Sequence, residues 1–223
     1  MAQQSSTTFI GLPNSGIAIQ QTGPVSATIT NGTAKAVLAF SLQWIWLNPD
    51  GSTQSTHNVT YIKPGEKLNP ELPPSFSRSI SVTDFASLKQ EYARVSGARV
   101  LLDAVVFDDD TVVGPDRTST TAVMQARAKA RQDVLGLIVA RPDIRSPEEI
   151  ERLVNENPPN AVSNARAAST MTAKAAWQYK FVYQTWSKSL IRIAQIQGVV
   201  GLREYVTNLR ARYQGTNYHQ KPL

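Results

Sequence analysis

The chain contains no cysteine and only two histidines, His57 and His219, among its 223 residues. Without cysteine it can form no disulfide, no thiolate nucleophile and no cysteine-ligated zinc, haem or iron–sulfur site. Two isolated histidines also disfavour histidine-dependent catalysis and histidine-rich metal sites. These absences favour a protein that binds over one that catalyses.

Motifs of the common catalytic classes and long hydrophobic runs are missing too. There is no phosphate-binding P-loop, no dinucleotide-binding glycine fingerprint, no Gly-x-Ser-x-Gly elbow and no His-Glu-x-x-His pattern. No stretch reaches the roughly 18–20 apolar residues of a membrane span, and no signal-peptide pattern is present. We therefore expect no enzyme activity, no cofactor and no transmembrane segment.

What charge there is divides unevenly along the chain. Residues 1–117 carry 8 basic and 10 acidic side chains, a net charge of −2, whereas residues 118–223 carry 15 basic and 7 acidic side chains, a net charge of +8. No Asp or Glu occurs between Glu156 and Glu204. Such a break in composition predicts two structural units with different surroundings.

The first half predicts an antiparallel β-sandwich of the immunoglobulin type. Its apolar residues come in short runs separated by turn residues, and over residues 36–47 apolar and small or polar side chains alternate with the period of a strand. One face of that strand, with Trp44 and Trp46, is expected to be heavily buried. Seven strands are expected, over residues 17–19, 25–30, 36–47, 57–62, 77–83, 98–107 and 111–113.

Two of these segments resemble a known group of proteins. Residues 77–83, followed by residues 100–116 with the sequence VLLDAVVFDDDTVVGPD, are similar to uncharacterised exported bacterial proteins. Those proteins carry an immunoglobulin-like sandwich that ends in a similar hairpin and is followed by helices. The resemblance implies a fold and export, and it implies no chemistry.

The second half predicts helices. Apolar residues recur at helical spacing from Val123 to Ile138, and the sequence Arg141-Pro142 ends that helix. Ser146 is a predicted N-cap for a short helix to about residue 155. A long helix is expected over residues 161–197, with glycines before a last helix over residues 202–213.

These patterns give an α+β chain with four parts. We expect a flexible leader over residues 1–15, the sandwich over residues 16–117, the helical unit over residues 118–214 and a loose tail over residues 215–223. The polar start of the leader is typical of a mature secreted or periplasmic chain with a Met in front. A cytosolic chain with a floppy polar tail is the alternative interpretation.

One acidic cluster invites a metal-site hypothesis. Asp108 and Asp110, with Asp109 between them, offer the hard oxygen ligands that calcium prefers. Their spacing is not that of an EF-hand, and carboxylates are common in exposed hairpin turns. A solvated turn is the favoured interpretation, and a cation site the alternative.

The outer face of the long helix is the candidate binding surface. Two large aromatic side chains lie opposite the expected core stripe, and they would be costly to leave exposed to water. Either the rest of the protein covers them or a partner does. The predicted partner-binding residues are Lys174, Trp177, Lys180, Phe181, Gln184, Lys188 and Arg192, and Arg166 belongs to the same basic face.

The sequence thus predicts a non-catalytic exported interaction or assembly protein. Its partner would be another protein or a second copy of the chain, bound through the helical half and the sandwich edges. The alternative is a nucleic-acid-binding protein that uses the basic C-terminal helices. No helix-turn-helix or RNA-binding signature supports the alternative.

Overall fold

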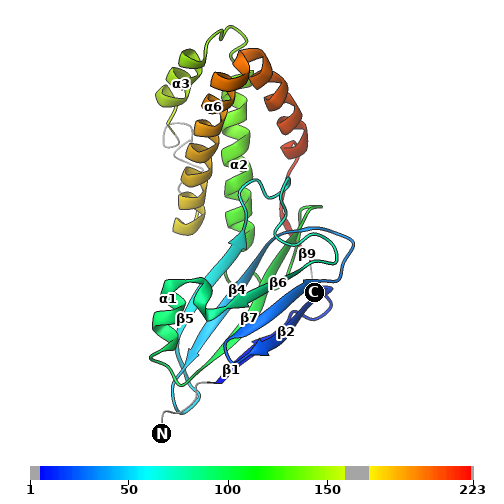
Figure 1. Cartoon of the computed structure of the whole chain (residues 1–223), viewed down its shortest axis with the longest axis vertical. Helices are drawn as coiled ribbons and strands as arrows, with labels where there is room; N and C mark the ends of the chain where they lie inside the picture. Colours follow the sequence, from blue (N-terminus) through cyan, green and yellow to red (C-terminus); the bar gives the residue numbers. More distant parts are fainter. Residues whose placement is uncertain (1–5, 159–170, 222–223) are drawn as a thin grey trace. The chain divides into compact units, whose positions relative to one another are not determined.

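The computed structural model describes residues 6–158 and 171–221. It divides into two compact units, one of residues 1–121 with 218–223 and the other of residues 122–217. The first unit contains the described strands and one short helix, and the second contains the longer helices (Figure 1). The expected α+β class, with mostly antiparallel sheets followed by helices, is confirmed.

The larger sheet of the first unit has six strands. Five follow the order β5-β4-β7-β8-β9, and β1 pairs with β7 beside this path. Pairing is antiparallel among β5, β4, β7 and β8, whereas β1 with β7 and β9 with β8 are parallel. The strands are β1 (Ser6–Ile10), β4 (Val37–Leu47), β5 (Thr53–Ile62), β7 (Gly97–Phe107), β8 (Thr111–Val113) and β9 (His219–Lys221).

The smaller sheet is antiparallel and faces the same core. It consists of β2 (Ile17–Gly23), β3 (Ser26–Asn31) and β6 (Ser77–Ser81), in that order. Buried side chains of both sheets, among them Ile29 and Trp44, form one hydrophobic cluster. After β6 the chain forms a short 3-10 turn, η1 (Val82–Asp84), and the helix α1 (Ala86–Tyr92), which the sequence analysis did not predict.

The first half of strand β4 is buried on both faces, where the sequence predicted one heavily buried face. Trp44 and Trp46 are fully buried as expected, but Ser41 on the opposite face is fully buried too. The hydroxyl of Thr118 donates a hydrogen bond to the Ser41 hydroxyl at 2.7 Å. The segment after β8 therefore reaches the second face of β4 at Ser41, a long-range contact with no local sequence signal.

The expected flexible leader and loose tail each contain a strand. β8 pairs with only two residues of β7, Val105 and Val106. The first half of the same edge of β7, Gly97–Leu101, pairs with β1. At the other end of the chain β9 pairs with β8, and Tyr218 before it is buried. Residues 1–5 and 222–223 lie outside the described residues.

The helical unit contains α2 (Thr120–Val139), α3 (Pro147–Glu156) and α6 (Ala173–Tyr213). Ser146 caps α3 as predicted, since its hydroxyl accepts a hydrogen bond from the backbone N–H of Glu149. Helix α6 starts at Ala173 behind the N-cap Thr172, later than the predicted start near residue 161. Residues 161–170 of that predicted helix lie outside the described residues.

Helix α6 is interrupted at Gly198, one of the glycines expected between the long helix and the last helix. This residue has φ 71° and ψ 175°, a backbone conformation that is essentially restricted to glycine. The chain reverses direction there, so α6 consists of two arms, residues 173–197 and 199–213 (Figure 1). The two arms contribute to one core together with α2 and α3.

A buried cation lies at the centre of this helical core. Arg131 of α2 is fully buried, and its guanidinium lies over the ring of Trp186 at 5.6 Å and over the ring of Tyr213 at 4.9 Å. Trp186 belongs to the first arm of α6 and Tyr213 to the second. Cation–π attraction therefore links α2 to both arms.

We predict that Asp103→Ala destabilises the first unit by about 1–3 kcal/mol, because it leaves two backbone N–H groups, one of them buried, without their acceptor. The buried Asp103 carboxylate accepts hydrogen bonds from the backbone N–H groups of Arg117 at 3.1 Å and Thr118 at 2.8 Å. Urea unfolding followed by circular dichroism measures the loss. Asp108→Ala, at an exposed position, is the control and should change stability by less than about 0.5 kcal/mol. Equal losses in the two variants would contradict this role of Asp103.

Candidate partner-binding surface

The two aromatic side chains singled out in the sequence lie exposed on the first arm of α6. Trp177 is 60% exposed and Phe181 is 45% exposed. Their rings stack on each other, with centroids 5.3 Å apart and an angle of 10° between the planes. They thus form a continuous apolar patch on the helix surface, one turn long.

The orientation of this patch follows from the helical core. Trp186 follows Trp177 by nine residues, which at 100° per residue places the two side chains on opposite sides of the helix. Trp186 packs in the core against Arg131 and Tyr213. With Trp186 turned inward, Trp177 and Phe181 must point away from the helical core.

Cationic side chains accompany the aromatic patch along the same arm. Lys180, Lys188 and Arg192 are exposed, as is Gln184, whereas Lys174 is half-buried. Arg166, predicted to belong to this face, lies outside the described residues. We call the surface formed by Trp177, Lys180, Phe181, Gln184, Lys188 and Arg192 the aromatic–basic face.

A groove between α3 and α6 continues the aromatic–basic face. Gln184 and Lys188 line it, and they follow Phe181 by three and seven residues, so they lie on the same side of the helix. The groove has a volume of about 320 Å³. Its remaining lining residues are Val154, Asn155, Pro158, Tyr183, Ser187 and Ile191.

One wall of the groove is fixed by a buried tyrosine. The hydroxyl of Tyr183 donates a hydrogen bond to the backbone oxygen of Asn157 at 2.5 Å, which ties α6 to the end of α3. Burial, together with the nearby charge of Asp133, raises the pKa of Tyr183 to about 12. Tyr183 therefore stays neutral at physiological pH and serves as a rigid wall.

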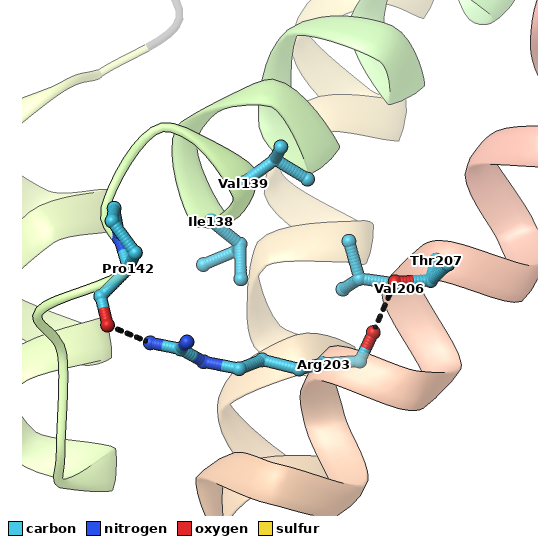
Figure 2. A pocket seen from close by; sticks show the side chains of 6 residues that line it. All are labelled: Ile138, Val139, Pro142, Arg203, Val206 and Thr207. Atoms are coloured by element: carbon cyan, nitrogen blue, oxygen red, sulfur yellow. Dashed lines mark hydrogen bonds between the residues drawn. The ribbon is translucent and has the colours of Figure 1, made fainter.

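A second, smaller pocket in the helical unit has its charged group already engaged. It is lined by Ile138, Val139, Pro142, Arg203, Val206 and Thr207 and has a volume of about 180 Å³ (Figure 2). Nη2 of Arg203 donates hydrogen bonds to the backbone oxygens of Pro142 at 2.6 Å and Ile144 at 3.1 Å. The guanidinium thus binds carbonyl groups that follow the C-terminal end of α2, and its role there is structural.

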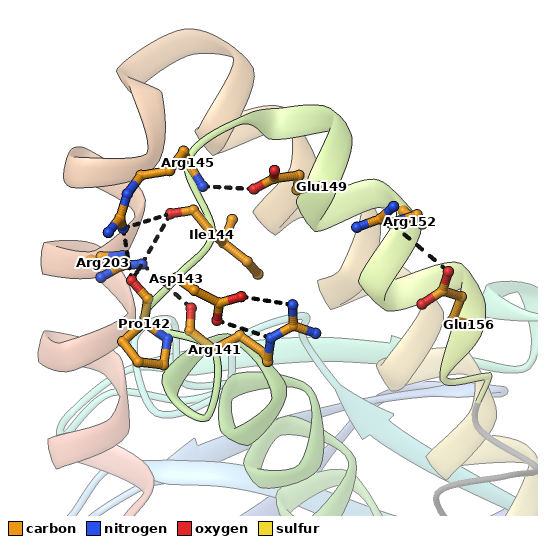
Figure 3. Close-up of polar contacts among 9 residues, drawn as sticks. All are labelled: Arg141, Pro142, Asp143, Ile144, Arg145, Glu149, Arg152, Glu156 and Arg203. Atoms are coloured by element: carbon orange, nitrogen blue, oxygen red, sulfur yellow. Dashed lines mark hydrogen bonds and ion pairs between the residues drawn. The ribbon is translucent and has the colours of Figure 1, made fainter.

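The loop between α2 and α3 is held by further polar contacts around the same arginine (Figure 3). The guanidinium of Arg141 binds the carboxylate of Asp143 through two hydrogen bonds, at 3.0 and 2.9 Å. The carboxylate of Glu149 accepts a hydrogen bond from the backbone N–H of Arg145 at 2.7 Å. These contacts set the position of α3, and with it one side of the groove.

Two aspartates of the acidic hairpin form ion pairs with lysines. Lys35 binds Asp109 at 2.5 Å, and Lys67 binds Asp110 at 2.8 Å, while Asp108 is exposed. Burial alone would raise the pKa of Asp109, but hydrogen bonds from Lys35 and Thr111 outweigh it and lower the pKa to about 2. No group of three or more His, Asp or Glu side chains in the described part of the chain is arranged to hold a metal ion.

The sequence predicted the residues of the aromatic–basic face as a binding surface and did not predict the groove beside it. Val154 and Pro158 belong to a different segment from Ser187 and Ile191, so only the packing of α3 on α6 brings them together. The one local signal was Ser187, a polar residue on the buried side of an amphipathic helix.

Comparison of this chain with protein-family models, with curated proteins and with solved structures finds no match. Among the described helices, none is both long enough and apolar enough to span a membrane.

We predict that Tyr183→Phe lowers the stability of the helical unit by about 0.5–1.5 kcal/mol at neutral pH, through loss of the hydrogen bond to Asn157. The folded-state pKa of about 12 lies above the ordinary value of 10.0, so unfolding favours loss of the tyrosine proton between these values. The stabilisation is therefore complete below pH 10 and is lost as the pH rises towards 12. Urea unfolding measured across this pH range should show that the free energy of unfolding falls less steeply with pH in the variant than in the wild type. An equal fall in both would contradict this role of Tyr183.

Proposed function

We propose that the chain is a non-catalytic interaction or assembly protein that binds a protein partner through its aromatic–basic face. The proposal rests on one observation, the stacked and exposed pair of Trp177 and Phe181. Exposed apolar patches of this kind mark interaction sites, and Trp is among the side chains that dominate binding energies at protein interfaces.

The charge around the pair supports a protein partner with an acidic surface. Lys180, Lys188 and Arg192 are exposed on the same helix arm, and that arm contains no Asp or Glu. Charge complementarity of this kind speeds association and disfavours wrong partners. The aromatic rings would supply the buried anchor, and the cations the surrounding rim.

The sheet unit offers a second means of assembly. Strand β5 ends the larger sheet, and in the smaller sheet β2 and β6 lie at the two edges. Edge strands accept a further strand from a partner or from a second copy. We also propose that the two sheets form an immunoglobulin-like sandwich and that the protein is exported. Both proposals are supported by the sequence resemblance.

Nucleic acid is the second candidate partner, favoured by a specific feature of the chain. Residues 157–203 contain no acidic side chain, and residues 118–223 carry a net charge of +8. Lysines and arginines beside exposed aromatic rings suit single-stranded nucleic acid, whose bases stack on such rings. Binding of this kind would weaken steeply with salt, because phosphate contacts release counterions.

We predict that the double variant Trp177→Ala, Phe181→Ala loses partner binding while its helical unit stays folded. A single hot-spot side chain contributes about 2 kcal/mol, so binding should weaken at least about thirtyfold. The tagged chain is purified from its native cells after crosslinking, and self-association is measured by analytical ultracentrifugation. The free energy of unfolding should change by less than about 1 kcal/mol, because both side chains are exposed.

Two matched variants separate surface effects from core effects. Phe76→Ala removes an aromatic side chain that is 61% exposed in the sheet unit, and it should leave partner binding unchanged. Trp186→Ala removes a core ring and should lower stability by about 3–5 kcal/mol. If the double variant unfolds as Trp186→Ala does, or if it retains its partner and its self-association, the proposal is wrong. Retention on single-stranded DNA that falls steeply with salt and requires Trp177 would favour the second candidate.

A further inference from the structure

The groove between α3 and α6 combines an apolar wall with polar groups. Val154 and Pro158 approach from the α3 side, and Tyr183 and Ile191 from α6. The hydroxyl of Tyr183 already donates a hydrogen bond to the backbone oxygen of Asn157, so Tyr183 can contact a ligand through its ring. A volume of about 320 Å³ leaves room for one large apolar side chain of a bound peptide.

A buried hydroxyl in the groove has an unused hydrogen-bonding capacity. Ser187 is 4% exposed, and its Oγ has no hydrogen-bond partner among the described residues. Helical serines and threonines commonly donate to the carbonyl four residues earlier, as Ser189 does to Thr185 and Thr185 does to Phe181. Ser187 makes no such bond, and because buried polar groups are normally paired, a polar group of a bound ligand would satisfy it.

The charged side chain that lines the groove is a cation, whereas the exposed Glu151 and Glu156 of α3 are not among the lining residues and Glu156 pairs with Arg152. Lys188 lines the groove and is exposed, and it is the one charged side chain among the described lining residues. Lys180 and Arg192 lie on the same arm of α6, which carries no carboxylate. A ligand with negative charge close to an apolar group matches this arrangement.

We propose that this groove binds an acidic peptide segment of the partner and takes up one of its large apolar side chains. The apolar side chain packs between Tyr183 and Val154, and the peptide backbone pairs with the hydroxyl of Ser187. A neighbouring carboxylate of the peptide pairs with the ammonium of Lys188. This inference rests on the proposed function, and it assigns the chemistry of the segment that the aromatic–basic face recognises.

Nucleic acid fits the groove less well than a peptide does. Arginine can hold a phosphate through two parallel hydrogen bonds, and the described lining residues contain lysine but no arginine. A base could stack on Trp177 or Phe181, but the groove beside them is walled by aliphatic side chains and by a tyrosine whose hydroxyl is engaged.

The test uses the full chain and fluorescently labelled synthetic peptides, with binding measured by fluorescence anisotropy. The first peptide places a leucine and a phenylalanine among aspartates and glutamates. The second replaces the two apolar residues by serine, and the third replaces the acids by lysine. Only the first should bind well, and the second and third should each bind at least about tenfold more weakly.

Variants of the chain locate the peptide. Lys188→Glu should weaken binding of the first peptide at least about tenfold, and Ser187→Ala about threefold to tenfold. Lys89→Glu, with the same charge change on the sheet unit, and Ser189→Ala, two residues after Ser187 and outside the groove lining, should leave binding unchanged. Since Lys188 is exposed, its variant should keep the wild-type melting temperature and stays informative even if Ser187→Ala is destabilised.

Four results would overturn the inference: no binding of the first peptide, equal binding of the first two peptides, binding that Lys188→Glu leaves intact, and binding of single-stranded DNA that displaces the first peptide and requires Lys188. The proposed function fails separately, when the Trp177 and Phe181 double variant keeps its native partner. Loss of that partner in the double variant, with no binding of the first peptide, would remove the groove from the interface and leave the proposed function standing.

Discussion

The helical unit depends on one buried cation between two aromatic rings. Arg131 of α2 is fully buried, with the ring of Trp186 on the first arm of α6 and the ring of Tyr213 on the second arm within cation–π distance. A guanidinium out of water is costly unless its surroundings supply compensating interactions. The contact therefore constrains how the two arms of α6 can be placed around α2, and Gly198 supplies the backbone conformation that lets α6 reverse between them.

The candidate surface is a geometric consequence of that core. Once Trp186 faces Arg131, the helical repeat turns Trp177 and Phe181 to the opposite side, where they stack on each other and stay exposed. Packing of α3 against the same arm then forms a groove next to them, with Ser187 in its lining. The surface thus combines exposed aromatic rings, positive charge and a groove, three features that protein interfaces use together.

Sequence patterns predicted the elements whose signals are local. The alternation around Trp44 and Trp46 predicted β4, and Ser146 with Pro147 predicted the start of α3, because alternate burial and capping depend on neighbouring residues. The strands β1 and β9 were missed, since their pairing with distant strands leaves no trace in short polar segments. The second buried face of β4 was missed for the same reason, because Thr118 reaches Ser41 from a remote part of the chain.

The sequence by itself determined the α+β class, the absence of cysteine chemistry and the acid-free arm on which two aromatic residues and several cations share one helix face. Composition and helical periodicity are sufficient for these conclusions. Only the tertiary structure decided that Trp177 and Phe181 stack and stay exposed, that Asp109 and Asp110 pair with Lys35 and Lys67, and that a groove with a buried hydroxyl adjoins the aromatic pair. Each of these depends on contacts between residues far apart in the sequence, and a local pattern carries no information about distant partners.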